Sequence, residues 1–240
     1  MSKNYKEHLI CFDAKIQYLT SDYPLTAYSL KTFLIKKEIN EIISVENASL
    51  FSHGGSYAQE KAVNISYEKI EKNIPEEFDD YSGYLWIDLD KLNKFITDNK
   101  NNIKQSIYTV AISCIENLSS QDQEEDRKYR KTYAEDHIAM SDFPPHWNTS
   151  PAKISTNWKL LGYDVVDGEF GGVLSGLTNC GYSNDEKEII KKRNWGNEIN
   201  SYHLFDSLEV ANEFRKYTNS RVTEHAPFYV FGIYFIEKIS

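Results

Sequence analysis

The chain has 240 residues, enough for one large domain or two small ones with a packed core. Hydrophobic residues make up 40% of it and aromatic residues 14%, which excludes global disorder. The net charge of −9 repels phosphate backbones and anionic lipids, so we expect neither nucleic-acid nor membrane binding. Many proteins are acidic for solubility alone, and this explanation stays open beside a functional one.

The first half of the chain alternates strand-like and helix-like segments. In chain order we expect a strand over 8–19, a helix over 26–43, strands over 62–70 and 84–89, a helix over 91–99 and a central strand over 106–118. Asp88 or Asp90 is expected to cap the second helix, because a carboxylate satisfies its free amide donors.

The second half begins with the segment 158–168, followed by a glycine-rich stretch that predicts tight turns. Ser183 or Asn184 is expected to cap a helix within 185–199, and Asp206 to cap a helix over 207–218. The apolar run 227–236 is too short to cross a bilayer and predicts a buried strand.

This pattern predicts an α+β fold with a mixed, mainly antiparallel sheet and several flanking helices. Residues 119–131 are polar and predict an exposed connection. We therefore expect an N-terminal α+β subdomain over 1–118, a connecting segment over 119–151 and a C-terminal α+β subdomain over 152–240, or a single domain over 1–240.

The cysteines indicate a reducing compartment. Cys11, Cys114 and Cys180 are odd in number and widely spaced, as is typical of buried free thiols. The N-terminal segment has no apolar region typical of a signal peptide. We therefore expect a cytoplasmic protein.

The most informative stretch is 71–90, which holds seven carboxylates, one lysine and interleaved aromatic residues. Acidic side chains beside aromatic ones attract a basic partner and then pack against it. The predicted partner-binding residues are Glu76, Glu77, Asp79, Asp80, Tyr81 and Tyr84. The alternative is that Leu85 and Trp86 are core residues of a strand and the acids are solvated.

No catalytic or metal-binding motif competes with this stretch. The chain lacks GxGxxG, GK[ST], GxSxG and HExxH motifs, so we expect no catalytic residue, no metal and no cofactor. One alternative is a thiol-dependent hydrolase with its site near Cys180, His203, Glu224 and His225, because a cysteine nucleophile needs a base within hydrogen-bond reach. Another is a subunit of a larger assembly with no activity alone.

Four segments of the second half carry a resemblance to a known class of protein: WKLLGYDVVDG, GGVLSGLTNCGY, YHLF and RVTEHAPFYVFGIY, within residues 158–235. Together with the size and acidity, they resemble immunity proteins of bacterial contact-dependent inhibition and related polymorphic toxin systems. The resemblance implies a cytoplasmic inhibitor that binds one toxin domain, often a nuclease, in a one-to-one complex and blocks its active site. It assigns no binding residue by position.

Overall fold

A computed structural model gives the fold. It describes residues 5–16, 86, 88–103, 106–121, 123–124, 128, 152–167, 175–177, 182–221 and 228–239. The segments expected as a helix over 26–43 and a strand over 62–70 lie outside these residues.

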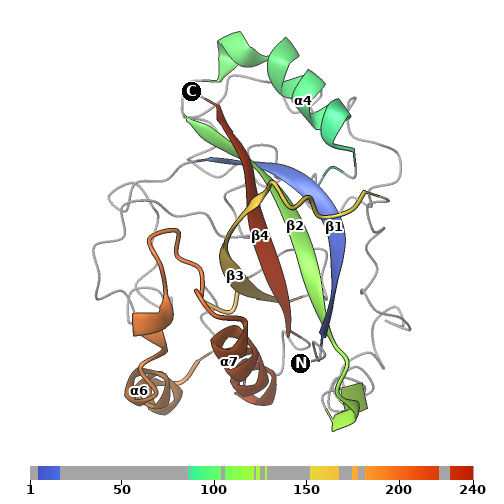
Figure 1. The fold of residues 1–240 in the computed structure, drawn as a ribbon. Helices are drawn as coiled ribbons and strands as arrows, with labels where there is room; N and C mark the ends of the chain where they lie inside the picture. The colour runs from blue at the N-terminus through green and yellow to red at the C-terminus, as the bar shows by residue number, and fades with distance from the viewer. Residues whose placement is uncertain are drawn as a thin grey trace, which may run out of the picture.

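The centre of the molecule is a four-stranded antiparallel sheet in the order β1-β2-β4-β3 (Figure 1). Its strands are β1 (Tyr5–Ile16), β2 (Ile107–Asn117), β3 (Lys159–Asp167) and β4 (Phe228–Ile239). β1, β2 and β4 confirm the strands expected from the sequence, and the α+β class is also confirmed.

Each strand contributes to two cores because successive side chains point to opposite faces of a sheet. Along β2, Ile107, Ala111 and Ile115 pack into the core on one face, whereas Val110 and Ile112 pack into the core on the other. Since both faces are buried, β2 is an almost continuous apolar run.

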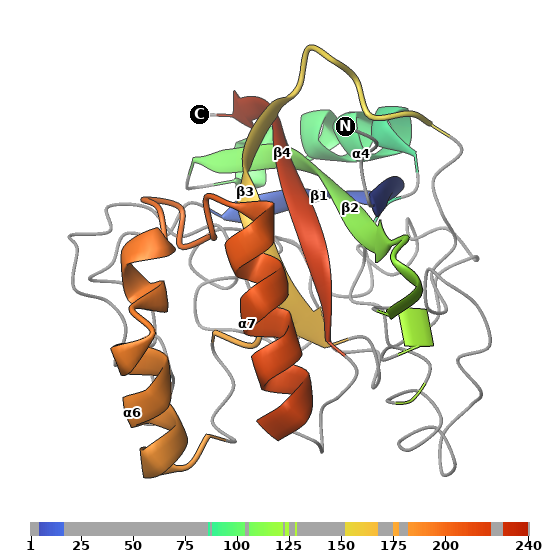
Figure 2. The ribbon, with the colours of Figure 1, turned by 60° about the horizontal axis from the view of Figure 1, so that its bottom comes forward.

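Three helices complete the described fold: α4 (Leu89–Asp98), α6 (Asn184–Lys192) and α7 (Leu208–Arg221). The 3₁₀ turns η1 (Lys100–Asn102) and η2 (Trp195–Glu198) follow the first two. Figure 1 shows α4 at one end of the sheet, and Figure 2 shows α7 running beside β3 and β4. We call the sheet face against which α7 packs the helix face and the opposite one the apolar face.

Capping explains where the helices begin. Asp88 accepts hydrogen bonds from the amides of Asp90 and Lys91 at 2.9 and 3.2 Å, as expected for the first residues of α4. Ser183 and Glu186 form a reciprocal capping box at α6. Both caps confirm one of the residues proposed from the sequence.

Two local expectations are wrong. Leu89, expected in a strand, is the first residue of α4, and Trp86 before it makes only an isolated bridge to Phe12. Asp206 does not cap α7: it accepts from the Asn200 side chain at 2.9 Å, while Ser207 precedes the helix and its Oγ accepts from the Val210 amide at 3.4 Å. Side chains at adjacent positions compete for the cap, and geometry favours the one nearer the helix.

The sheet takes two strands from each side of the connecting segment 119–151. β2 pairs with β4 over most of its length, from Ile107 opposite Ile239 to Ile115 opposite Val230. The two halves of the chain therefore contribute strands to the same sheet. Within the described residues, no helix combines the length and the apolar character needed to span a membrane.

Candidate functional site: a carboxylate and three tyrosines on the sheet

The partner-binding residues expected from the sequence, Glu76, Glu77, Asp79, Asp80, Tyr81 and Tyr84, lie outside the described residues. Trp86, close to them in sequence, is 2% exposed and exchanges backbone hydrogen bonds with Phe12 at 2.6 and 2.8 Å. Trp86 is therefore a core residue, as the alternative interpretation of this stretch held.

Of the four residues of the alternative thiol-dependent site, the structure describes one, His203. Cys180, Glu224 and His225 lie outside the described residues, whereas His203 is fully buried at a positive φ of 64°. Asn200 orders this turn, because its Oδ1 accepts from the amides of Tyr202 and Leu204 at 2.9 and 3.2 Å. His203 thus lies inside a tight, side-chain-braced turn.

The structure instead brings together a polar group on the helix face, centred on Glu7. Ser113 Oγ donates to Glu7 Oε1 at 2.5 Å, and the Tyr234 hydroxyl donates to the same oxygen at 2.7 Å. Ser113 Oγ also lies 3.3 Å from the Gly232 carbonyl oxygen. Three strands, β1, β2 and β4, therefore position one carboxylate. We call Glu7, Ser113, Tyr234, Tyr163 and Tyr5 the Glu7 cluster.

Gly232 makes the room for this carboxylate. It pairs with Ser113 on β2 and with Tyr163 on β3, so it lies between them in the sheet. A Cβ atom at this position would lie 2.7 Å from Ser113 Oγ and 2.9 Å from Glu7 Oε1. Because any other side chain would occupy that space, the glycine allows Glu7 to reach across β2 toward β4.

Two tyrosines of the cluster, Tyr163 and Tyr234, are held in the neutral form. Burial raises the pKa of Tyr163 to about 12, and the negative charge of Glu7 adds to the effect, followed by Tyr5 and Glu209. Burial also raises the pKa of Tyr234, and its hydrogen bond to Glu7 acts in the same direction. Tyr163, Tyr234 and Glu7 are each half-buried, so part of each side chain stays accessible to solvent.

Chemically, the cluster suits recognition of a cation. It offers carboxylate and phenol oxygens together with aromatic rings, and rings attract cations to their faces. Metal chemistry has no such support: nowhere in the described part of the chain do three or more His, Cys, Asp or Glu residues come together as metal ligands.

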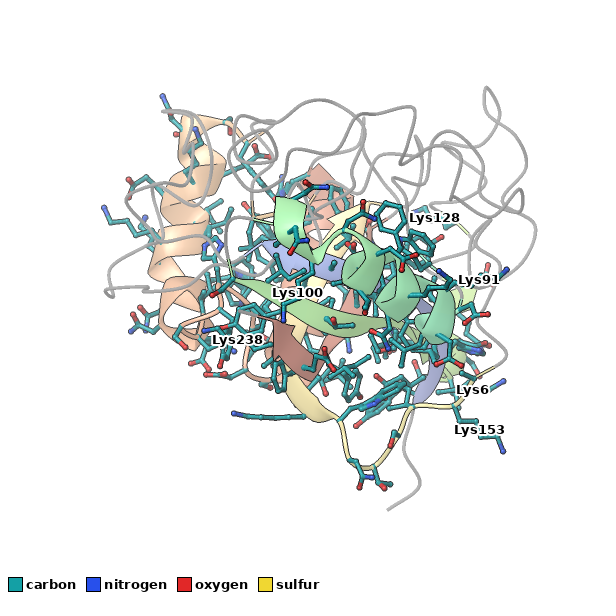
Figure 3. The ribbon with its side chains drawn as sticks, turned by 90° about the horizontal axis from the view of Figure 1, so that it is seen from above. Lys6, Lys91, Lys100, Lys128, Lys153 and Lys238 are labelled. Carbon is teal, nitrogen blue, oxygen red and sulfur yellow. The ribbon has the colours of Figure 1, made fainter. Side chains whose placement is uncertain are left out.

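Exposed lysines form the other noticeable surface feature. Figure 3 labels Lys6, Lys91, Lys100, Lys128, Lys153 and Lys238, which are exposed and belong to several separate segments. Lysine ammonium groups on flexible stems stay hydrated and impose little geometry. We therefore place the candidate site at the Glu7 cluster and not among these lysines.

Few features of the sequence point to the Glu7 cluster. Glu7 precedes the predicted strand 8–19, and Ser113 lies inside an apolar strand where a single hydroxyl attracts no attention. A polar residue within an otherwise apolar run was the one available signal, because a buried hydroxyl needs a partner.

Compared with family models, with curated proteins and with solved structures, the chain matches none. The resemblance to immunity proteins therefore stays an expectation, and function has to be inferred from the chain's own residues.

Proposed function

We propose that the protein is an immunity protein: a cytoplasmic, stoichiometric inhibitor that binds one basic toxin domain, a nuclease of the RNase type, and blocks its active site. A nuclease binds a polyanion and so presents a basic cleft. An acidic protein that enters this cleft mimics the charge of the substrate and is steered to it by long-range attraction.

The observation that carries the proposal is the Glu7 cluster, a carboxylate fixed among tyrosines on a rigid sheet. Aromatic residues and well-held charges are the groups that dominate the energy of protein interfaces. The net charge supports the same conclusion: residues 1–150 hold 24 acidic and 17 basic residues, whereas residues 151–240 hold 12 and 10.

The first test is formation of the complex. The proposal predicts that a neighbouring gene encodes a basic toxin domain; co-expression with that domain should restore growth of the host, and the two proteins should purify together in a one-to-one ratio. The association rate should fall at least about tenfold between low and high salt, because added ions screen exposed charges. Absence of both rescue and complex contradicts the proposal.

Charge reversal tests the acidic stretch expected from the sequence. Replacing Glu76, Glu77, Asp79 and Asp80 with Lys should slow association about tenfold. The matched control replaces four exposed acids on other elements with Lys, namely Asp98, Glu198, Glu213 and Glu237. Both variants change the net charge equally, so an equal loss would remove the 76–84 stretch from the interface. Melting temperatures of both variants show whether each still folds.

A further inference from the structure

We infer that the Glu7 cluster is a docking site for an arginine side chain of the partner protein. This inference rests on the proposed function and specifies the chemistry of one contact within it. Four features of the described residues support it: the unshared oxygen of Glu7, the lack of a neighbouring cation, the arrangement of the tyrosines and the rigidity of the supporting strands.

The first feature is that the two carboxylate oxygens of Glu7 differ in their hydrogen bonds. Ser113 and Tyr234 both donate to Oε1, whereas Oε2 accepts no hydrogen bond from the described part of the chain. A carboxylate has about four acceptor sites. The internal bonds therefore orient the group and leave one oxygen for an external donor.

The second feature is electrostatic. The carboxylate of Glu7 raises the pKa of both Tyr163 and Tyr234, and Glu209 also raises the pKa of Tyr163. No basic side chain among the described residues acts on either tyrosine in the opposite direction. A half-buried carboxylate without a counter-charge gains more from a cation than an exposed one, because the surrounding dielectric is lower.

Elsewhere in the chain, Tyr217 shows how nearby arginines offset the effect of burial on the pKa of a tyrosine. Arg193 and Arg221 lie over the Tyr217 ring at 5.7 and 5.9 Å, and both lower the pKa of that tyrosine against the effect of burial. Arg193 also lies 5.2 Å from the centroid of Trp195. Arginine over an aromatic ring is thus an arrangement that this fold already uses, and within the described residues neither Tyr163 nor Tyr234 has it.

The third feature selects arginine over lysine. A planar guanidinium can stack on a tyrosine ring while one N–H donates to Glu7 Oε2 and another to a phenol oxygen. Tyr163 suits the second role, because its hydroxyl makes no hydrogen bond within the described part of the chain and it lies on β3 beside Gly232. An ammonium is a compact, strongly hydrated charge that gains less from the rings.

The fourth feature is rigidity. Ser113 and Gly232 are buried, and the strands that carry them form the centre of the sheet. A preorganised acceptor loses little conformational entropy on binding, so more of the interaction energy appears as affinity.

Basic peptides test this site without the toxin. Fluorescein-labelled deca-arginine and deca-lysine are titrated with the full chain, with Glu7→Gln and with the control Glu237→Gln. Both variants lose one negative charge, but Glu237 is exposed and lies five residues along β4 from Gly232. Glutamine at position 7 keeps an oxygen that accepts from Ser113 and Tyr234.

We expect Glu7→Gln to weaken deca-arginine binding about tenfold, as is typical when a hydrogen bond to a charged group is lost. Glu237→Gln should weaken it less than about twofold, in keeping with an exposed charge. Equal effects of the two variants would overturn the site. Equal affinity of the wild type for deca-lysine and deca-arginine would overturn the choice of arginine.

A second variant, Tyr163→Leu, tests the site independently in case Glu7→Gln does not fold. Tyr163→Leu keeps an apolar side chain in the sheet and should weaken deca-arginine binding about threefold with little change for deca-lysine. Different results contradict the immunity function and the docking site. If the toxin is not neutralised but peptide affinity still depends on Glu7, the immunity function alone is contradicted. If Glu7→Gln leaves the toxin complex unchanged, the docking site alone is contradicted.

Discussion

The two faces of the sheet carry different chemistry on the same four strands. On the apolar face, Ile10, Val110, Ile112, Phe231 and Ile233 are each at most 1% exposed and pack together. On the helix face, the adjacent positions Ser113 and Gly232 hold the carboxylate of Glu7. Since neighbouring residues of a strand alternate in direction, one residue step separates a core position from a site position.

The comparison teaches that one side of the sheet is core alone, whereas the helix face combines a second core with a polar cluster. Burial of the apolar face supplies free energy through the removal of hydrocarbon from water. The Glu7 cluster adds a fixed charge direction to the burial on its own face, because Ser113 and Tyr234 orient the carboxylate. Substitutions on the two faces should therefore separate folding from binding.

The largest effect is expected on the apolar face. Ile112→Ala should lower the free energy of unfolding by about 3–4 kcal/mol, because a fully buried isoleucine leaves a cavity that the close-packed core cannot fill. The matched change on the helix face, Ser113→Ala, should cost about 1 kcal/mol through the lost hydrogen bond to Glu7. Urea denaturation of both variants measures the difference. Equal losses would show that the two faces contribute alike.

A smaller effect is expected at Gly232 on the helix face. Gly232→Ala should lower the free energy of unfolding by about 2 kcal/mol, because the new Cβ displaces Ser113 Oγ and Glu7 Oε1. The same variant should lose the Glu7-dependent part of peptide binding, since the carboxylate no longer rests above the glycine. A stable variant with unchanged affinity would show that Glu7 does not need this space.

The smallest effect is a loss of folding stability at alkaline pH, caused by ionisation of Tyr163 on the helix face. The pKa of Tyr163 lies near 12 in the folded chain but near 10 when unfolded, so the neutral phenol favours the folded state. This contribution is complete below pH 10 and is lost as the pH rises toward 12. Glu7→Gln should lower the folded pKa of Tyr163 and so reduce this loss.

Ultraviolet absorbance of the tyrosinate, followed with urea midpoints from pH 9 to 12, measures both quantities. Glu237→Gln serves as the control because Glu237 is exposed and is not among the groups that act on Tyr163. Identical titration curves for Glu7→Gln and the wild type would separate Tyr163 from the Glu7 charge.

The sequence predicts most of the described strands and helices, but it does not predict which side chains come together in the sheet. Alternation and apolar runs located β1, β2 and β4, and the Asp88 and Ser183 caps were readable from local chemistry alone. β3 was not recognised as a strand. Its pairing with β4 shifts register between Leu160 and Gly162, and this irregularity interrupts the alternation.

The Glu7 cluster could not be predicted for a related reason. Glu7, Ser113 and Tyr234 are separated by 106 residues or more along the chain and meet only through strand register. Register depends on which faces are buried, and that becomes known only when the sheet is assembled. The expected site at residues 76–84 came from local composition, which is the kind of information that a single sequence does contain.

The strand order has a consequence for synthesis on the ribosome. Among the described strands, β3 pairs only with β4, and β4 follows it by about 60 residues, so β3 emerges before this partner exists. At roughly 5–20 residues per second, this interval lasts about 3–12 s. During that time, β2 and β3 both present open edges that attract other nascent chains. The arrival of β4 closes both edges in one step, and a chain interrupted before residue 228 keeps them open.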